Sequence, residues 1–533
     1  MAPEDTGILS CNSPMQRCLA IPEVVQSIVR YTARDGKKDA VALSITCRSF
    51  HDAAQDAIWG NITTLFDLLK CFPEDMWHAI DLGPKFLRNL RPPAPHEWER
   101  FLSNAARVRS FKHLSDCHHG HWLYIIAICR PTLDIFPNIR HLEWHETGGE
   151  LWHAHLFTSR NLLTLVITPE NDERFERVAS VVNSVAYSAC PLREFRLQAD
   201  EDCDPGEELQ HALTALISAK DLEVYDCNVE LGPKAINLLA QIPTLKTAKG
   251  ILLQRPVQWR YIFQRLSLGV CFPSIEVFQM NVEDLAYAHL FAVAARSTSR
   301  NLTDLTVIQR EDPVEELAHA FFRELGNRPV PSNFRKFSYL THRDKAHPKI
   351  SRRHREEYDI VFRTLAPLFA LSHLTHLHIV SDHLKLDDDD IHALVLALPQ
   401  LESLLLRPGF YCYTLVGVAH AARHLPRLRE LGLTIDVSTC PPASPLAAPA
   451  PPCNMTCATL DFANSPLPAE LVRDVACFLG ALFGHRELEI ALFKLHDFLD
   501  MENFAFKAAW RSCLEHMRPG RVVRDANVHG GCQ

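Results

Sequence analysis

SRNLLTLVI at residues 159–167 and SRNLTDLTV at residues 299–307 begin with the same four letters and continue in the same register. Each stretch has apolar residues at a first position, three residues later and five residues later, as in Leu162, Leu165 and Ile167. In a short strand this spacing turns alternate side chains toward one core. Two such copies far apart in the chain indicate a repeated unit rather than a single strand.

The same pattern recurs along the chain at a nearly regular period. Twelve copies begin between residues 105 and 437, mostly 23 to 32 residues apart, with one spacing of 40. Because 47% of the residues are apolar, the bare spacing also arises by chance, but a proline precedes six copies by one or two residues. A repeat is therefore the better interpretation. The first apolar residues of the copies are Val108, Ile139, Leu162, Leu192, Leu222, Leu245, Ile275, Leu302, Phe334, Leu374, Leu401 and Leu428, of which the copies at Val108 and Leu245 match least well.

Helical segments connect the strands of this pattern, for example residues 208–216 and 391–398. A strand and a helical return of this length bury their apolar faces only by stacking on neighbouring copies. The pattern resembles an irregular leucine-rich repeat, although the asparagine or cysteine that follows the strand in that family is mostly absent. We therefore expect an α/β repeat solenoid over residues 105–437. A conventional α/β domain with leucine-rich helices is the alternative.

A second informative stretch, IPEVVQSIVRYTARDGKKDAVALSITCRSFHDAAQDAIW, covers residues 21–59. Pro22 stands where the first turn of a helix tolerates a missing N–H, and apolar residues then recur at helical spacing. Gly36 separates a second apolar segment, and a third follows Phe50. The stretch predicts three short helices, which bury too little apolar surface to be stable alone. An ordinary helical hairpin at the edge of a larger core is the alternative.

The order of these residues resembles an F-box. The resemblance is carried by Ile21-Pro22-Glu23, the alternation of Val41, Leu43 and Ile45, the turn Cys47-Arg48-Ser49-Phe50, and Trp59 at the end. The stretch departs from the family in having Phe50 where many members have Trp, and in the polar linker over residues 34–38.

The resemblance implies a partner and a role. In that family the F-box binds a small Skp-type adaptor, which connects to a cullin and a ubiquitin-conjugating enzyme, while the repeats hold the protein to be ubiquitinated. Seven residues match adaptor-facing or frame positions of the family: Ile21, Pro22, Val24, Ile28, Leu43, Cys47 and Trp59. Their expected role is apolar burial against the adaptor, with most of the binding energy on Pro22, Leu43 and Trp59.

Composition narrows the remaining classes of function. A net charge of −9 over 533 residues argues against a nucleic-acid partner. We find no secretory leader near the N-terminus and no uninterrupted apolar stretch long enough to span a bilayer, so no membrane partner is expected. The seventeen cysteines follow no pairing pattern and are expected to be reduced thiols. A cytoplasmic or nuclear location is the resulting expectation.

A metal site or an enzyme active site would be an alternative to the adaptor function. Cys117, His118, His119 and His121, with His141, His145, His153 and His155 further along, supply zinc-type ligands, but their spacing matches no common site. Phosphate-binding and hydrolase motifs are absent from the sequence. We therefore expect no catalytic residue, no metal and no cofactor, with an enzyme of unrecognised site as a minor alternative.

Two charged segments interrupt the repeats. Residues 342–355 are basic and fall within the spacing of 40, which predicts an inserted loop that is either simply solvated or a substrate contact. If the loop is a substrate contact, Arg352, Arg353 and Arg355 would bind an acidic or phosphorylated segment of the substrate. Residues 387–390 are all aspartate and are expected to cap the helix that begins at Ile391.

The sequence thus predicts the substrate-recognition subunit of a Skp-cullin-F-box ubiquitin ligase. A ligase-independent scaffold, in which the three-helix unit only caps the repeats, is the alternative, and exposure of Pro22 and Leu43 would favour the adaptor-binding hypothesis. The predicted division of the chain is a disordered tail (1–17), an F-box (18–60), a helical linker or cap (61–104), the repeat array (105–437), a proline-rich loop (438–453), a final repeat and C-terminal cap (454–518) and a disordered tail (519–533).

Overall fold

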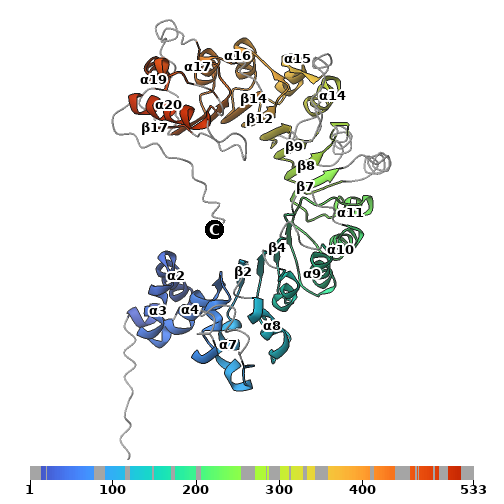
Figure 1. Cartoon of the computed structure of the whole chain (residues 1–533), viewed down its shortest axis with the longest axis vertical. Helices are drawn as coiled ribbons and strands as arrows, with labels where there is room; N and C mark the ends of the chain where they lie inside the picture. The colour runs from blue at the N-terminus through green and yellow to red at the C-terminus, as the bar shows by residue number, and fades with distance from the viewer. Residues whose placement is uncertain are drawn as a thin grey trace, which may run out of the picture. The chain divides into compact units, whose positions relative to one another are not determined.

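The computed structural model (Figure 1) divides into two compact units, residues 1–238 (unit 1) and 239–533 (unit 2). The structure describes residues 14–19, 21–76, 91–114, 120–146, 149–169, 175–199, 206–253, 271–283, 285–286, 288, 301–310, 314–327, 333–341, 358–408, 413–438, 457–462, 465, 467–483, 487–490 and 502–517. No helix within these ranges has both the length and the apolar composition needed to cross a membrane.

Unit 1 begins with short helices, as the pattern of residues 21–59 predicts. They are α1 (Pro14–Leu19), α2 (Pro22–Thr32), η1 (Ala33–Asp35), α3 (Lys37–Thr46) and α4 (Arg48–Trp59). Gly36 has a φ of 142°, which a residue with a side chain rarely adopts, and it separates η1 from α3. Cys47 is extended and separates α3 from α4. Residues 14–17, predicted to be a disordered tail, lie in α1, and residues 1–13 are outside the described part.

The strands of unit 1 pair in chain order and run parallel. They are β1 (Asn61–Ile62), β2 (Ser110–Leu114), β3 (His141–His145), β4 (Thr164–Thr168), β5 (Glu194–Leu197) and β6 (Val224–Cys227). The connecting helices are α5 (Phe66–Leu69), η3 (Pro95–Glu97), α7 (Trp98–Ala105), α8 (Gly120–Cys129), η4 (Leu151–Phe157), α9 (Phe175–Tyr187), α10 (Gly206–Ala219) and α11 (Pro233–Leu239).

Unit 2 continues the same plan. Its parallel strands are β7 (Thr247–Leu253), β8 (Val277–Val282), β9 (Asp304–Gln309), β10 (Lys336–Thr341), β12 (His376–Ser381), β14 (Ser403–Pro408), β15 (Glu430–Leu433), β16 (Cys457–Asp461) and β17 (Glu487–Ile490), beside a small pair, β11 (Ile360–Val361) and β13 (Leu384–Lys385). The helices are α14 (Glu315–Gly326), α15 (Phe362–Leu365), η7 (Ala366–Ala370), α16 (Asp388–Ala397), α17 (Leu415–His424), η8 (Ala469–Leu471), α19 (Val472–Phe483) and α20 (Glu502–Met517). In Figure 1 the helices α14, α16 and α17 lie on one side of the strands.

All twelve copies of the apolar pattern coincide with a strand, from β2 to β15. The first apolar residue of each copy is buried just before its strand, and the second residues pair in register from one strand to the next. In unit 1 this ladder is Phe111, Leu142, Leu165, Phe195 and Tyr225. The predicted strands joined by helical returns are therefore confirmed, and the structure shows that these strands run parallel.

A recurring backbone contact marks the start of each repeat. The carbonyl oxygen of Arg140 accepts hydrogen bonds from the amides of Leu163 and Thr164, at 2.8 and 2.9 Å. The same arrangement recurs at the start of nearly every strand, for instance where the carbonyl of Thr375 accepts from two successive amides of the next repeat. The repeats therefore share a common entry geometry as well as an apolar core.

The copy that begins at Leu245 is irregular in the structure as well as in the sequence. The pairing of β7 with β8 shifts between Ala248 and Ile251. Gly250 lies inside this bulge with a φ of 69°, the left-handed region that favours glycine. The weak sequence match thus reflects a strand that departs from the common register.

Four strands are not predicted by the sequence analysis: β1, β16 and the two-residue strands β11 and β13. Strand β1 lies in the segment predicted to be a helical linker (61–104), so the sheet begins at Asn61 rather than near residue 105. Strand β16 pairs with β15 inside the segment predicted to hold one final repeat. Both are short or low in leucine, which explains why the apolar pattern did not find them. The predicted proline-rich loop (438–453) lies outside the described residues beyond position 438, as does the whole tail over 519–533.

The C-terminal helix α20 closes the described part of unit 2. Trp510 is buried, donates a hydrogen bond from Nε1 to the carbonyl oxygen of Ser465 at 3.0 Å, and lies 4.6 Å from the ring of Phe462. Helices α19 and α20 pack against each other. The role of this helix as a cap of the repeat array stays a prediction.

A buried polar group in unit 1 makes the stability of the fold dependent on pH. His153 is 2% exposed, and its Nδ1 has no hydrogen-bond partner. Burial, helped by the neighbouring His155, lowers the pKa of His153 to about 4 from 6.5. The unfolded chain therefore binds more protons than the folded chain between these two values, and stability falls as the pH falls through this window.

We expect this histidine to cost the folded state about 2 kcal/mol between pH 7 and pH 5. Urea denaturation of the parent and of a His153→Asn variant at both pH values measures the difference in pH dependence. His211→Gln on α10 is the matched control, because His211 is exposed. Equal pH dependence of the parent and the His153 variant would contradict this prediction.

Candidate docking surface

Helix α3 exposes two large apolar side chains and buries two small residues. Ala40 and Ser44, four residues apart, are buried, whereas Val41 is 47% exposed and Ile45 is 83% exposed. Helix α3 packs more extensively against α4 than against α2. A helix at the surface of a folded domain normally turns its large apolar residues toward the core. The outer face of α3 is therefore a candidate docking surface.

Helix α2 contributes further exposed apolar residues. Ile21 is 46% exposed, Ile28 38% and Tyr31 72%. Together with Val41 and Ile45, they are five of the thirteen exposed large apolar residues in the described chain, although they span only residues 21–45. Concentrated exposure of this kind is typical of protein-interaction sites. We call these five residues and Pro22 the α2/α3 apolar set.

Cationic side chains border this set. The guanidinium of Arg34 lies 5.6 Å from the centre of the Tyr31 ring. Lys37 at the start of α3 makes a long contact with Asp67 of α5, 3.4 Å between Nζ and Oδ2, and both side chains are largely exposed. An apolar centre with a polar rim is the usual composition of a docking surface.

Helix α4 connects the helices that carry the α2/α3 apolar set to the first strands of the sheet. Arg107 contacts Asp52 at 3.1 Å and Asp56 at 2.5 Å, both on α4. The carbonyl oxygen of Gly60, directly after α4, accepts from the amides of Arg109 and Ser110 at 2.8 and 2.9 Å. A side chain at Gly60 would meet the backbone oxygen of Asp56 at 2.5 Å, so the tight junction requires glycine. The apolar set therefore rests on a helix anchored at its C-terminal end.

The seven residues predicted from the F-box resemblance are all exposed or half-buried. Those that the structure places at the surface are Ile21, Pro22, Ile28 and Cys47, and those that it places half-buried are Val24, Leu43 and Trp59. Trp59 donates from Nε1 to Oε1 of Gln55, three ångströms away. Pro22 thus meets the exposure that the adaptor-binding hypothesis requires, and Leu43 meets it in part.

Three members of the set were not among the predicted site residues: Tyr31, Val41 and Ile45. Val41 and Ile45 entered the prediction only as part of the apolar alternation. The signal that could have found them is the pair of small residues Ala40 and Ser44, since small residues at i and i+4 point to the packed side of a helix. Tyr31 carries no such signal in the sequence.

A second surface lies on the strands of unit 2. Asp304, Lys336, His376, Ser403 and Glu430 occupy equivalent positions on neighbouring strands and pair in register across the sheet. They alternate with the buried ladder, so they face away from the core. Burial raises the pKa of Asp304, while the Lys336 ammonium opposes the rise. The strands therefore present a row of polar and charged groups.

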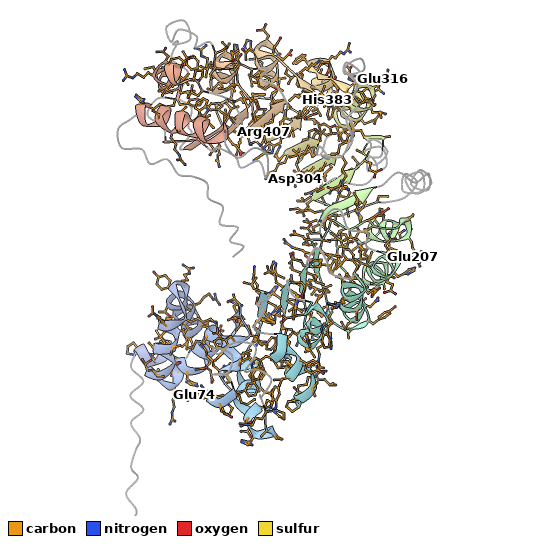
Figure 2. The ribbon with its side chains drawn as sticks, viewed as in Figure 1. Glu74, Glu207, Asp304, Glu316, His383 and Arg407 are labelled. Atoms are coloured by element: carbon orange, nitrogen blue, oxygen red, sulfur yellow. The ribbon has the colours of Figure 1, made fainter. Side chains whose placement is uncertain are left out.

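Hydrogen bonds connect part of this row. The hydroxyl of Ser403 donates to Oε2 of Glu430 at 2.6 Å and lies 2.7 Å from Nε2 of His378. Figure 2 shows Asp304 and Arg407 on the side of these strands opposite helices α14 and α16. The Ser403 hydroxyl thus has both an imidazole and a carboxylate as partners, but it is only 2% exposed. These contacts connect Ser403 to the two neighbouring strands and leave the hydroxyl little access to a substrate.

Among the candidate metal ligands whose side chains the structure describes, His141, His145, His153 and His155 belong to no group of three that could hold one ion. Nδ1 of His141 lies 3.0 Å from the hydroxyl of Thr164, and Nε2 of His145 lies 2.6 Å from Oε1 of Glu143. His118 and His119, with the adjoining Cys117, fall outside the described residues, as do Arg352, Arg353 and Arg355 of the basic segment. The capping prediction is confirmed, because the Asp387 carboxylate accepts from the amide of Asp390 at 2.9 Å, although α16 begins at Asp388 rather than at Ile391.

Comparisons with known proteins give no family. No family model matches the chain, and no curated protein matches it. Among solved structures, a crystal structure of the Rad7 and Elc1 complex in yeast aligns with a TM-score of 0.37 and 13% sequence identity, over 79% of this chain and 93% of the other. That similarity is too low to support an argument about function.

Proposed function

We propose that this protein is the substrate-recognition subunit of a Skp-cullin-F-box ubiquitin ligase. In this proposal the helices α2 to α4 form an F-box that binds a Skp-type adaptor, and the repeats form an irregular leucine-rich-repeat array that binds the protein to be ubiquitinated. The observation that carries the proposal is the exposure of the α2/α3 apolar set on helices whose sequence resembles an F-box. The protein then acts in the cytoplasm or nucleus without chemistry of its own.

Burial of the α2/α3 apolar set against a partner would contribute favourable free energy to binding. Burial of apolar surface contributes about 25 cal/mol for each Å² removed from water. The side chains of Ile45 and Tyr31 are 83% and 72% exposed, so most of their surface is available to a partner. Because α4 is anchored to the sheet through Arg107, the surface needs little reordering on binding, which lowers the entropic cost of association.

The row of polar groups on the strands of unit 2 supports the second half of the proposal. A substrate receptor needs an open surface with varied hydrogen-bonding groups, and Asp304, Lys336 and Glu430 provide charges of both signs there. Polar contacts of this type set specificity and register more than affinity. The row is therefore the proposed contact region for the protein substrate.

Co-expression with a Skp-type adaptor and a cullin tests the proposal. We expect the parent chain to copurify with both partners, and a Pro22→Ala, Leu43→Asp double variant to lose both while it stays folded by far-UV circular dichroism. Failure of the folded parent to capture the adaptor would contradict the proposal.

A ligase-independent scaffold is the second candidate. The contacts that favour it are those of Arg107 with α4 and of Gly60 with the first strands, since they make the three helices an N-terminal cap of the sheet. This candidate predicts that the parent binds no Skp-type adaptor, and that deleting residues 21–59 destabilises the repeats.

A further inference from the structure

Three histidines meet on neighbouring helices of unit 2. His392 lies on α16, and His420 and His424 lie one turn apart on α17. One ring nitrogen of each lies within 4.8 Å of a ring nitrogen of the other two. All three side chains are half-buried. The ring centre of His392 lies 4.2 Å from that of His420 and 5.0 Å from that of His424.

The approach of the two helices is fixed by Asp388. Its carboxylate accepts hydrogen bonds from the amide and hydroxyl of Thr414, at 3.0 and 2.6 Å, and from the amide of Gly417 at 3.0 Å. A side chain at Gly417 would meet the Asp388 carboxylate at 2.6 Å and the Ile391 side chain at 3.0 Å. A larger residue at this position would therefore displace the Asp388 carboxylate from its contact with the Gly417 amide.

These contacts align the histidines. His392 follows Asp388 by four residues on α16, and His420 follows Gly417 by three residues on α17, so each histidine lies on the face that the aspartate and glycine bring together. His424 is one further turn along the same face of α17. The approach of the two helices that carry the imidazoles is thus set by contacts of the Asp388 carboxylate, which do not involve the imidazoles themselves.

The charges around the cluster are mixed. An imidazole binds a metal ion through the lone pair of a ring nitrogen. Arg423 adds a positive charge beside His420 and His424, while the Asp388 carboxylate adds a compensating negative charge near His420.

We propose that His392, His420 and His424 bind one divalent transition-metal ion of the zinc type. Three imidazoles with a fourth position open to solvent are a known ligand set for zinc, and the i, i+4 pair on one helix is a common way to supply two of them. Tetrahedral coordination at ~2.0 Å brings ligand nitrogens to about 3.4 Å from one another. The present separations of up to 4.8 Å close to that value by rotation of the side chains.

The bound ion would have a structural consequence. It would tie α16 to α17 on the helical side of the array, in addition to the Asp388 contacts, and so join two successive repeats. This inference does not depend on the proposed ligase function, because the cluster lies in unit 2 and the α2/α3 apolar set lies in unit 1. The alternative is that the rings form a stack of neutral imidazoles that binds no ion.

Metal titration of the full chain tests the site. The protein is prepared without a polyhistidine tag and titrated with Co²⁺, followed by its visible absorption, and with Zn²⁺ in competition with a chromogenic chelator. The variants are His392→Gln and the double variant His420→Gln, His424→Gln. The control is His211→Gln, an exposed histidine on α10.

We expect the parent and the His211→Gln control to bind one more equivalent of metal than the double variant. His392→Gln should weaken this equivalent by more than the ~10- to 100-fold that loss of an outer-shell partner costs. Equal stoichiometry and affinity in all four proteins would overturn the proposal.

A second measurement on the parent itself does not require a folded variant. Carbethoxylation of histidines by diethyl pyrocarbonate, mapped by mass spectrometry, should slow at His392, His420 and His424 when one equivalent of Zn²⁺ is added. His211 should react at an unchanged rate. Unchanged reaction at the three clustered histidines would overturn the proposal independently of the titration.

Discussion

Replacing Ile45 by aspartate is expected to weaken binding of a Skp-type adaptor by about 30-fold or more, which corresponds to the roughly 2 kcal/mol that defines a hot spot. Ile45 is 83% exposed, so the folded chain itself loses little, and its stability should change by no more than about 0.5 kcal/mol. In the complex, however, the carboxylate would be buried without a partner. Isothermal titration calorimetry with the purified adaptor measures the change.

Leu133→Asp is the matched control for this substitution. Leu133 is also 83% exposed and lies before β3, outside the α2/α3 apolar set. The same chemical change at the same exposure should leave adaptor binding unaltered. If Ile45→Asp and Leu133→Asp bind the adaptor equally well, the outer face of α3 is not the docking surface.

Replacing Phe337 by alanine is expected to destabilise unit 2 by about 3–5 kcal/mol. Phe337 is fully buried in β10, pairs in register with Leu305 and Leu377, and lies about 6 Å from the ring of Phe322 on α14. Alanine would leave a cavity between strand and helix that neighbouring repeats hold open. Urea denaturation followed by circular dichroism gives the change in the free energy of unfolding.

The adjacent residue supplies the control. Ser338 points to the opposite face of the same strand and is half-buried. We expect Ser338→Ala to change the free energy of unfolding by about 0.5 kcal/mol or less. Similar effects of the two substitutions would mean that the core does not lie on the side of the sheet that faces α14.

The repeated strands could be predicted from sequence because their stability depends on a local pattern. Leu165 and Leu305 are buried in equivalent registers because each copy presents the same apolar spacing to its neighbours. The helix cap at Asp387 could be predicted for the same reason, because its carboxylate accepts a hydrogen bond from an amide in the same turn. Strand β16 was missed because its pairing depends on β15 rather than on an apolar pattern of its own.

The candidate surfaces were less accessible to sequence reasoning. An apolar pattern predicts an amphipathic helix but does not decide which face is packed, and in α3 the large residues Val41 and Ile45 lie outside while Ala40 lies inside. The histidine cluster depends on the approach of α16 to α17, which is set by Asp388 and Gly417 from different repeats. Such long-range contacts leave no regular spacing in the sequence.

Hydrogen exchange with and without a purified Skp-type adaptor tests the central claim most directly. The account predicts that adaptor binding slows exchange in α2 and α3, around Ile28 and Ile45, and leaves the strands of unit 2 unchanged. Protection confined to other segments, or no protection at saturating adaptor, would contradict the assignment of the α2/α3 apolar set as the adaptor-binding surface.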